Sequence, residues 1–223
     1  MNSRMSAFII VFILIATAGF IFGPKWANKD IPVSKEPLDL EYDVNLPDGS
    51  KEPVSTEKET PEGSKLSPYP VPDLNRPVVI YSDIPEETKS VAKQRITALM
   101  ETLSKNTSLV DDWVELGTYR KLIGDYDAAL EIWGHASRLS PNSSAPYNNI
   151  AVLYASYIRD YQKAEEYYLK TIKAAPSQPY PYFAAFEFYK SILKDDKKAE
   201  DIVRQGIAAS PGAKAELEQL LVD

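Results

Sequence analysis

Three prolines, Pro141, Pro176 and Pro211, recur at an interval of 35 residues, and the segments that precede them align residue for residue. A fixed interval of about 35 residues is typical of helical hairpins that stack on one another. Each hairpin buries its apolar face only against its neighbours, so such an array shares a continuous core. The spacing therefore predicts an all-α solenoid of three helix–turn–helix repeats.

The aligned repeats share an order of residue types, with aromatic, aliphatic and small residues followed by an alanine and a closing proline. In the first repeat these residues are Trp113, Leu116, Gly117, Ala129, Trp133, Ala136 and Pro141. In the second they are Tyr147, Ile150, Ala151, Tyr154, Ala164, Tyr168, Thr171 and Pro176. In the third they are Tyr182, Ala185, Phe186, Tyr189, Ala199, Val203, Gly206 and Pro211. This order resembles the tetratricopeptide repeat (TPR) over residues 109–211. The resemblance implies a scaffold that binds other proteins and carries no chemistry of its own.

The turn inside each repeat has its own signals. Acidic residues stand before each second helix, where a carboxylate accepts hydrogen bonds from exposed backbone N–H groups. These residues are Asp125, Asp160 and Asp195. The second and third repeats carry one more residue between their helices than the first does. Arg159 and Lys194 stand there where Gly124 makes the first turn. We expect looser or longer turns in those two repeats.

A flanking helix is expected at each end of the repeats. Residues 85–108 begin with Pro85, Glu86 and Glu87, which suit a first helical turn because proline loses no hydrogen bond there and carboxylates favour the helix dipole. Apolar residues at helical spacing follow, at Ala92, Ile96, Leu99, Met100 and Leu103. Residues 212–223 carry another apolar stripe, at Ala213, Leu217, Leu220 and Leu221. This stripe predicts a short helix that caps the last hairpin.

Residues 25–84 are predicted to form an acidic linker that holds most of the chain's 17 prolines. Proline blocks helix formation, and repulsion between like charges extends the chain. The stretch 67–72 has polyproline character, typical of a stiff spacer and also of a ligand for an aromatic groove. Residues 77–81 are instead apolar and β-branched. We expect this short segment to lie in extended form on the neighbouring helices.

Residues 1–24 contain an uncharged apolar run from Ala7 to Gly23. At 1.5 Å per residue a helix of this length spans roughly 26 Å, close to the thickness of a bilayer core. We expect a transmembrane helix with the repeats outside the cytoplasm. The alternative is a signal peptide, because Ala16, Thr17 and Ala18 resemble a cleavage site, which would lead to a secreted protein. The apolar residues that continue after this site favour the uncleaved anchor.

The composition argues against several classes of function. The net charge of −7 and the absence of a basic block make nucleic acid an unexpected partner. The chain has no cysteine, and its one histidine is His135, so a metal site or a catalytic dyad has little to be built from. No glycine-rich phosphate loop or Ser–His–Asp set is present. We therefore expect no catalytic residue, no metal and no cofactor.

The resemblance places a partner-binding groove along the first helix of each repeat. Carried over position by position, it gives the candidates Val114, Thr118, Asn148, Val152, Tyr180, Phe183, Glu187 and Lys190. Family members that clamp a C-terminal carboxylate use Lys, Arg and Asn, and Val114 and Thr118 stand where Lys and Asn would be needed. The pattern favours a hydrophobic peptide or helix, while packing between repeats is the competing role for Tyr180 and Phe183.

These observations predict a membrane-tethered scaffold that recruits a partner protein and is not an enzyme. One alternative is a structural module whose solenoid self-associates or docks its own linker. Another is a non-catalytic accessory subunit of a cell-envelope enzyme. The sequence leaves the identity of the partner and the oligomeric state open.

Overall fold

The computed structural model describes residues 70–221, which contain eight α-helices and no strand. The apolar run at residues 7–23 and the linker up to residue 69 lie outside this part of the chain. Within it, no helix is both long and apolar enough to cross a membrane.

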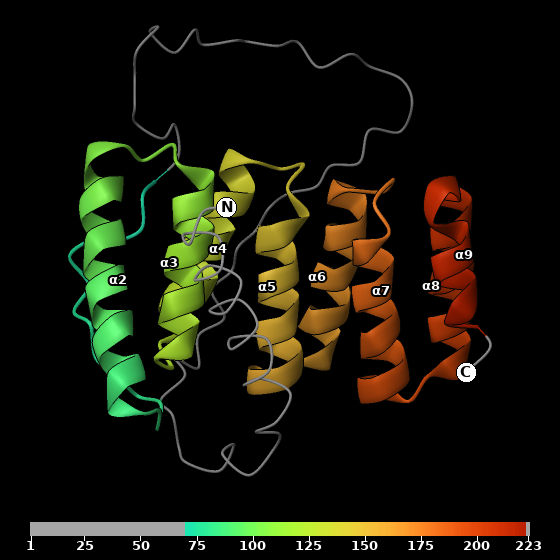
Figure 1. The fold of residues 1–223 in the computed structure, drawn as a ribbon, viewed down its shortest axis with the longest axis horizontal. Helices are drawn as coiled ribbons and strands as arrows, with labels where there is room; N and C mark the ends of the chain where they lie inside the picture. The colour runs from blue at the N-terminus through green and yellow to red at the C-terminus, as the bar shows by residue number, and fades with distance from the viewer. Residues whose placement is uncertain (1–69, 222–223) are drawn as a thin grey trace, which may run out of the picture. The chain divides into compact units, whose positions relative to one another are not determined.

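Three helical hairpins follow one another along the chain, with a helix at each end (Figure 1). The first flanking helix is α2 (Glu86–Lys105). The first hairpin pairs α3 (Val110–Leu122) with α4 (Tyr126–Leu139). In the second, α5 (Ser144–Leu153) continues as η1 (Tyr154–Ile158) and pairs with α6 (Tyr161–Ala174). In the third, α7 (Tyr180–Glu187) continues as η2 (Phe188–Leu193) and pairs with α8 (Asp196–Ala209). The short η3 (Pro211–Ala213) and α9 (Lys214–Gln219) end the described region. The predicted all-α fold of three helical hairpins is therefore confirmed for this part of the chain, and it is consistent with a TPR-like solenoid.

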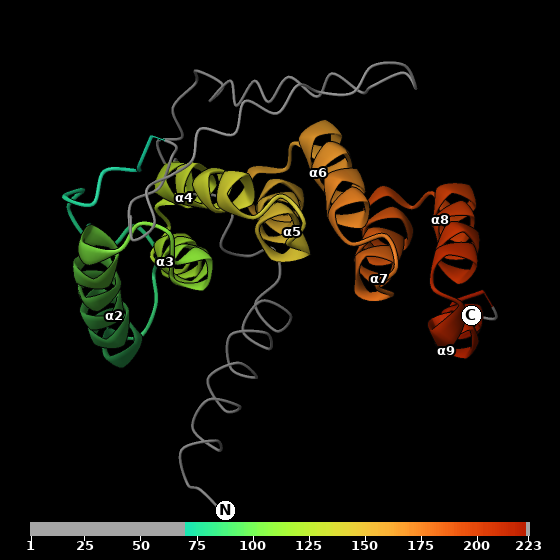
Figure 2. The same cartoon turned by 90° about the horizontal axis from the view of Figure 1, so that it is seen from above.

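The hairpins place their helices in two rows (Figure 2). The first-helix row holds α3, α5 and α7, and the second-helix row holds α4, α6 and α8. Within the first-helix row α3 packs on α5 and α5 packs on α7. Side chains of the first helices from successive repeats therefore share one face.

The acidic residues before the second helices cap them as predicted. Asp160 accepts a hydrogen bond from the backbone N–H of Lys163, and Asp195 accepts one from Lys198, each at 3.0 Å. Asp125 does the same for Ala128 at 3.4 Å. Each carboxylate satisfies a backbone donor that the helix leaves without an internal partner.

Two glycines mark places where helices approach closely. A Cβ atom on Gly117 would overlap the indole ring of Trp133, which is fully buried. A Cβ atom on Gly206 would lie 2.7 Å from Cγ of Tyr182. At both positions an aromatic ring of the same repeat occupies the space that any larger residue would need.

The expectation of looser turns in the second and third repeats is wrong. The first repeat connects its helices through three residues, Ile123–Asp125, whereas Arg159 and Asp160 alone connect η1 to α6. The extra residue is absorbed inside the first helix, which ends as the π-helices η1 and η2. A π-turn adds one residue to a helix without lengthening the connection. Arg159 and Lys194 follow in the left-handed conformation, with φ of 64° and 57°, as Gly124 does at 82°.

The apolar side chains form two cores that meet in α4. The N-terminal core joins α2, α3 and one face of α4, including Ile132 and Ala136. The C-terminal core begins on another face of α4, at Leu130 and Trp133, and continues to Leu217 of α9. Each core therefore depends on α4, and α2 and α9 close their outer ends.

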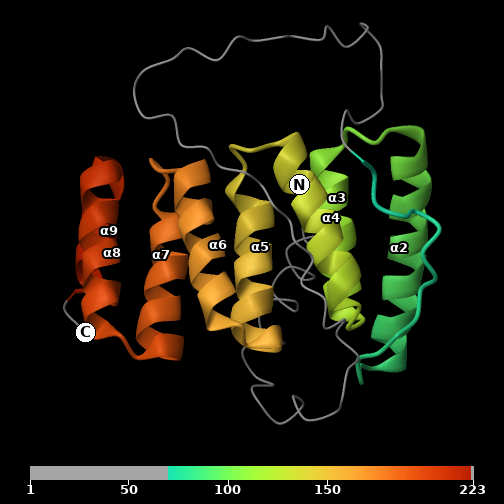
Figure 3. The same cartoon turned by 180° about the vertical axis from the view of Figure 1, so that it is seen from behind.

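Residues 70–84 lie on the N-terminal core, and we call this segment the strap. It makes a tight turn at Leu74 and Asn75, where the N–H of Arg76 donates to the carbonyl of Asp73 at 3.3 Å, and runs extended from Arg76 to Tyr81. From Pro72 onward its even-numbered side chains face the helices, whereas Pro70 and the odd-numbered residues are exposed. The inward residues are Pro72, Leu74, Arg76, Val78, Ile80, Ser82 and Ile84. Figure 3 shows the strap passing beside α2 before it turns into that helix. The expected docking of residues 77–81 is therefore observed, and the packed region begins well before residue 85.

Candidate functional site

The eight candidate residues all belong to the first helices of the repeats. Val114 and Thr118 lie on α3, Asn148 and Val152 on α5, and Tyr180, Phe183 and Glu187 on α7, with Lys190 following on η2. Because α3, α5 and α7 are neighbours in one row, the fold places the candidates on adjacent elements (Figure 2). We call the surface of these helices that carries them the first-helix face.

A hydrogen bond links two of the candidates across neighbouring repeats. The side-chain amide of Asn148 donates to the hydroxyl oxygen of Tyr180 at 2.9 Å. Asn148 is buried, and its Oδ1 atom has no partner among the described residues, whereas 54% of Tyr180 is exposed. The buried Asn148 therefore fixes the orientation of the Tyr180 side chain, which is exposed to solvent.

The other candidates are partly buried or already engaged. Val152 and Phe183 pack against the C-terminal core with part of their surface exposed. The carbonyl of Val114 accepts hydrogen bonds from the hydroxyl of Thr118 at 2.9 Å and from the indole of Trp133 at 3.0 Å. This part of the face therefore offers mainly apolar side chains and few unsatisfied polar groups.

The charged candidates stand at one end of the face. Lys190 pairs with Asp196 at 3.1 Å, and Glu187 accepts a hydrogen bond from Ser191 at 3.1 Å. No positive cluster suited to a carboxylate forms from the candidates, since Val114 and Thr118 carry no charge. Nor does any group of three His, Cys, Asp or Glu residues within residues 70–221 have the arrangement of a metal site.

Sequence reasoning missed a polar cluster under the strap, centred on Arg120. This side chain is 1% exposed and donates to the backbone carbonyls of Arg76 at 2.8 Å and of Pro77 at 2.9 Å. The backbone N–H groups of Tyr81 and Ser82 donate to the carbonyl of Ile123, at 2.8 and 3.1 Å. Main-chain groups of the strap are thus held at two places by the first hairpin.

Asp125 joins the strap to the hairpin through charge. Arg76 binds its carboxylate with two nitrogens, at 2.7 and 2.9 Å, and Arg120 binds it at 3.1 Å. The hydrogen bond to Asp125 raises the pKa of Arg76, while burial lowers the pKa of Arg120. The ordinary pKa of an arginine side chain lies far above neutral pH, so Arg76 and Arg120 both stay charged. Two cations therefore share one buried carboxylate. The same carboxylate caps α4, which makes it common to the strap, α3 and α4.

One departure within the repeats signals this cluster. Seven residues after its first aromatic residue, the second repeat has Tyr154 and the third has Tyr189, whereas the first repeat has Arg120. A buried arginine in place of a core tyrosine needs acceptors, because an unpaired buried charge is costly. The sequence contains this signal, but it does not identify the acceptors on the strap.

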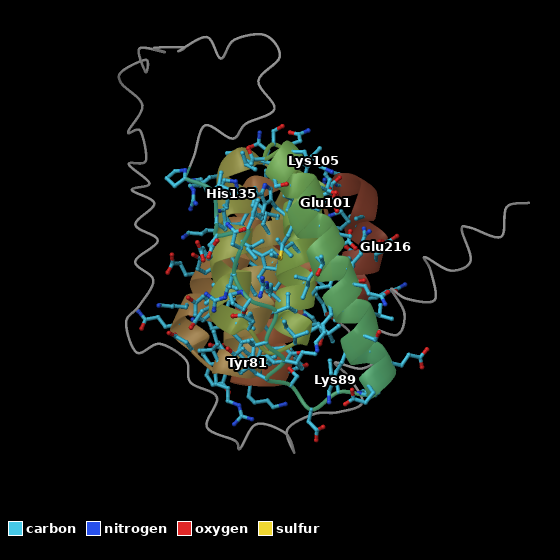
Figure 4. The ribbon with its side chains drawn as sticks, turned by 90° about the vertical axis from the view of Figure 1, so that its left-hand side faces the viewer. Tyr81, Lys89, Glu101, Lys105, His135 and Glu216 are labelled. Atoms are coloured by element: carbon cyan, nitrogen blue, oxygen red, sulfur yellow. The ribbon has the colours of Figure 1, made fainter. Side chains whose placement is uncertain are left out.

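His135 lies under the other end of the strap. The residue is fully buried, its ring meets that of Trp113 edge to face at 4.8 Å, and neither ring nitrogen has a hydrogen-bond partner of good geometry in residues 70–221. Burial lowers its pKa to about 4, Arg138 acts in the same direction, and the backbone of Pro70 opposes them. Figure 4 shows His135 and Tyr81 toward opposite ends of the helices. His135 is therefore a neutral core residue.

Comparison with known proteins gives a limited result. Neither a family model nor a curated protein matches the chain. A solved structure described as the crystal structure of MamA is similar, with a TM-score of 0.44 and 21% sequence identity. The alignment covers 63% of this chain and 92% of that chain. The helical hairpins described above are consistent with a TPR-like solenoid over residues 109–211.

Proposed function

We propose that this protein is a scaffold that binds a partner protein on the first-helix face of its TPR-like solenoid. The observation that carries the proposal is the exposed ring of Tyr180, oriented by the buried Asn148 of the preceding repeat. Aromatic side chains held in place by packing lose little entropy on binding and often dominate interfaces. The partly exposed Val152 and Phe183 supply apolar surface on the same helices.

The partner class follows from this surface. The face has apolar and aromatic side chains, and its lysine is paired with Asp196. A hydrophobic peptide or an amphipathic helix of another protein suits it better than an acidic terminus does. In this proposal the apolar run at residues 7–23 is a membrane tether, the linker is a spacer, and the repeats work outside the cytoplasm.

A site-specific crosslink tests the binding face. A photoreactive phenylalanine analogue replaces Tyr180 in the full-length chain in its own cells, and a matched chain carries it at Leu169. Leu169 lies on α6 in the second-helix row and is 47% exposed, close to the 54% of Tyr180. We expect one discrete partner adduct from position 180 and none from position 169, identified by mass spectrometry. Equal adducts from both positions, or none from position 180, would refute the proposed face.

A second candidate function is structural, and the strap favours it. A solenoid of three repeats has a small core, so docking of its own linker adds useful burial. In that case the strap completes the fold and the solenoid acts by self-association. Analytical ultracentrifugation of the full-length chain separates the two: a tight homodimer without any adduct at position 180 supports the structural role.

A further inference from the structure

We propose that the strap occupies a second peptide-binding site, formed by α2, α3 and α4, which takes a peptide with a tight turn followed by an arginine and an extended stretch of alternating apolar residues. In this protein the occupant is the chain's own residues 70–82. The groups that bind the strap, on Arg120, Ile123 and Asp125, are not among the candidates of the first-helix face, so the proposal does not depend on the proposed function.

The strap is bound in the manner of a peptide ligand. Extended peptides direct alternate side chains to the surface that binds them, while their main-chain groups supply affinity. Leu74, Val78 and Ile80 pack against the N-terminal core, Arg76 also faces the helices, and the odd-numbered residues between them are exposed. The strap bonds through its backbone to Arg120 and Ile123, as a ligand of this class does.

The site also has a group that selects one side chain. Asp125 is 4% exposed and receives two hydrogen bonds from Arg76, at 2.7 and 2.9 Å. Arginine forms this two-pronged bond with a carboxylate, and lysine does not, because its ammonium group is a point charge. The site therefore selects arginine at that position of the peptide.

The site remains electrostatically complete when the peptide leaves. Arg120 and Asp125 pair with each other at 3.1 Å, and Asp125 also caps α4, and neither contact involves the strap. Departure of the strap would expose both groups to water without isolating a buried charge. The three repeats also form their helical hairpins without any strand or helix from the strap.

The covalent link to α2 keeps the site occupied. A ligand on a short tether has an effective concentration of the order of millimolar, so a free peptide competes poorly with it. A fair test therefore cuts the link while leaving the rest of the chain in place. Asp83 is exposed, and the junction between Ser82 and Asp83 is a suitable position for a protease cleavage site.

The experiment uses the full-length chain with that cleavage site, purified in detergent. After cleavage, an excess of a fluorescent synthetic peptide with the sequence of residues 70–82 is added, and binding is followed by fluorescence anisotropy. We expect saturable exchange into the cut chain and none into the uncut chain. A peptide with Arg76→Ala should bind at least tenfold more weakly, because it loses both bonds to Asp125. A peptide with Val79→Thr, altered at a position that is 47% exposed and lies outside the turn, should bind as the unaltered peptide does.

Circular dichroism measures how much helix the cut chain retains, and this separates the remaining outcomes. Loss of helix on cleavage would overturn the proposal, since the strap would then be a part of the fold and not a ligand. Helix retained without peptide exchange would overturn it as well. Equal affinity of the Arg76→Ala peptide and the unaltered peptide would refute arginine selection.

Discussion

Asp125 combines contacts of different kinds in one side chain. It stands at the same position in its repeat as Asp160 and Asp195, and all three cap a second helix. Only Asp125, of these three, also pairs with arginines, and Arg120 is almost completely buried with it. At this position of the repeat, the second and third copies only cap a helix, whereas Asp125 in the first copy also joins separate parts of the tertiary structure.

Asp125→Asn should destabilise the protein by about 3 kcal/mol, because it leaves the buried Arg120 without its counter-charge. Asp160→Asn is the matched control, and we expect a loss below about 1 kcal/mol, since asparagine caps helices nearly as well as aspartate. Urea unfolding of both variants at neutral pH measures the two free energies. Similar losses would show that the arginine cluster contributes little beyond the cap.

The buried His135 predicts a pH dependence of stability. Burial lowers its pKa from the ordinary value of about 6.5 to about 4 in the folded state. A histidine whose pKa is lowered by folding stabilises the protein fully above pH 6.5, and this contribution is lost as the pH falls toward 4. The full effect is roughly 3 kcal/mol, from 1.36 kcal/mol per pKa unit.

Because His135 is the chain's one histidine, His135→Gln is a direct control for this effect. We expect the free energy of unfolding to fall more steeply between pH 6.5 and pH 4.5 in the unaltered protein than in the variant. Urea titrations across this range measure the difference. Parallel curves would mean that the ring gains a proton without cost, and hence that it is accessible to water in solution.

At the scale of helices, the first helices of the second and third repeats end in π-turns. Each π-turn is followed by a residue with positive φ, Arg159 or Lys194. Neither side chain is branched at Cβ, but a Cβ atom alone disfavours the left-handed conformation by roughly 1–2 kcal/mol. These two positions are therefore strained, whereas Gly124 meets the same requirement in the first repeat without that cost.

Arg159→Gly and Lys194→Gly should each stabilise the protein by about 0.5 kcal/mol. The relief of strain exceeds the entropy that glycine loses on folding, which is roughly 0.5–1 kcal/mol. Gln205→Gly, at an exposed position inside α8, is the control and should cost about 1 kcal/mol. Thermal unfolding of the three variants compares them. Destabilisation by all three would mean that the left-handed residues are held by interactions of their side chains.

The sequence predicts the helices well and the strap contacts poorly, for a physical reason. Repeat periodicity and capping residues are local, so the hairpins and their caps could be read from residues close in the chain. The contact between Arg76 and Asp125 spans 49 residues, and no periodicity connects them. The π-turns fall between these cases: the extra residue is visible in the alignment, but whether a turn or a helix absorbs it depends on packing. The candidate face follows from the resemblance, while the burial of Asn148 needed the structure.

At the scale of the described region, the two cores share one helix, α4, and different residues of that helix belong to each core. Ile132 and Ala136 belong to the N-terminal core, whereas Leu130 and Trp133 belong to the C-terminal core. In a solenoid, stability is the sum of repeat and nearest-neighbour terms. A change near one end should therefore open nearby helices first and reach the far end through α4.

Leu217→Ala tests this view from the C-terminal end. Leu217 is fully buried in the C-terminal core, and its truncation should cost roughly 2–4 kcal/mol. Because α9 packs on α8, amide hydrogen exchange should accelerate most in α8 and α7 and least in α2 and α3. Glu216→Ala, at an exposed position of the same helix, should change neither stability nor exchange. Equal acceleration from α2 to α9 would show that the two cores unfold as one cooperative unit, since the loss at one end would then be shared by every helix.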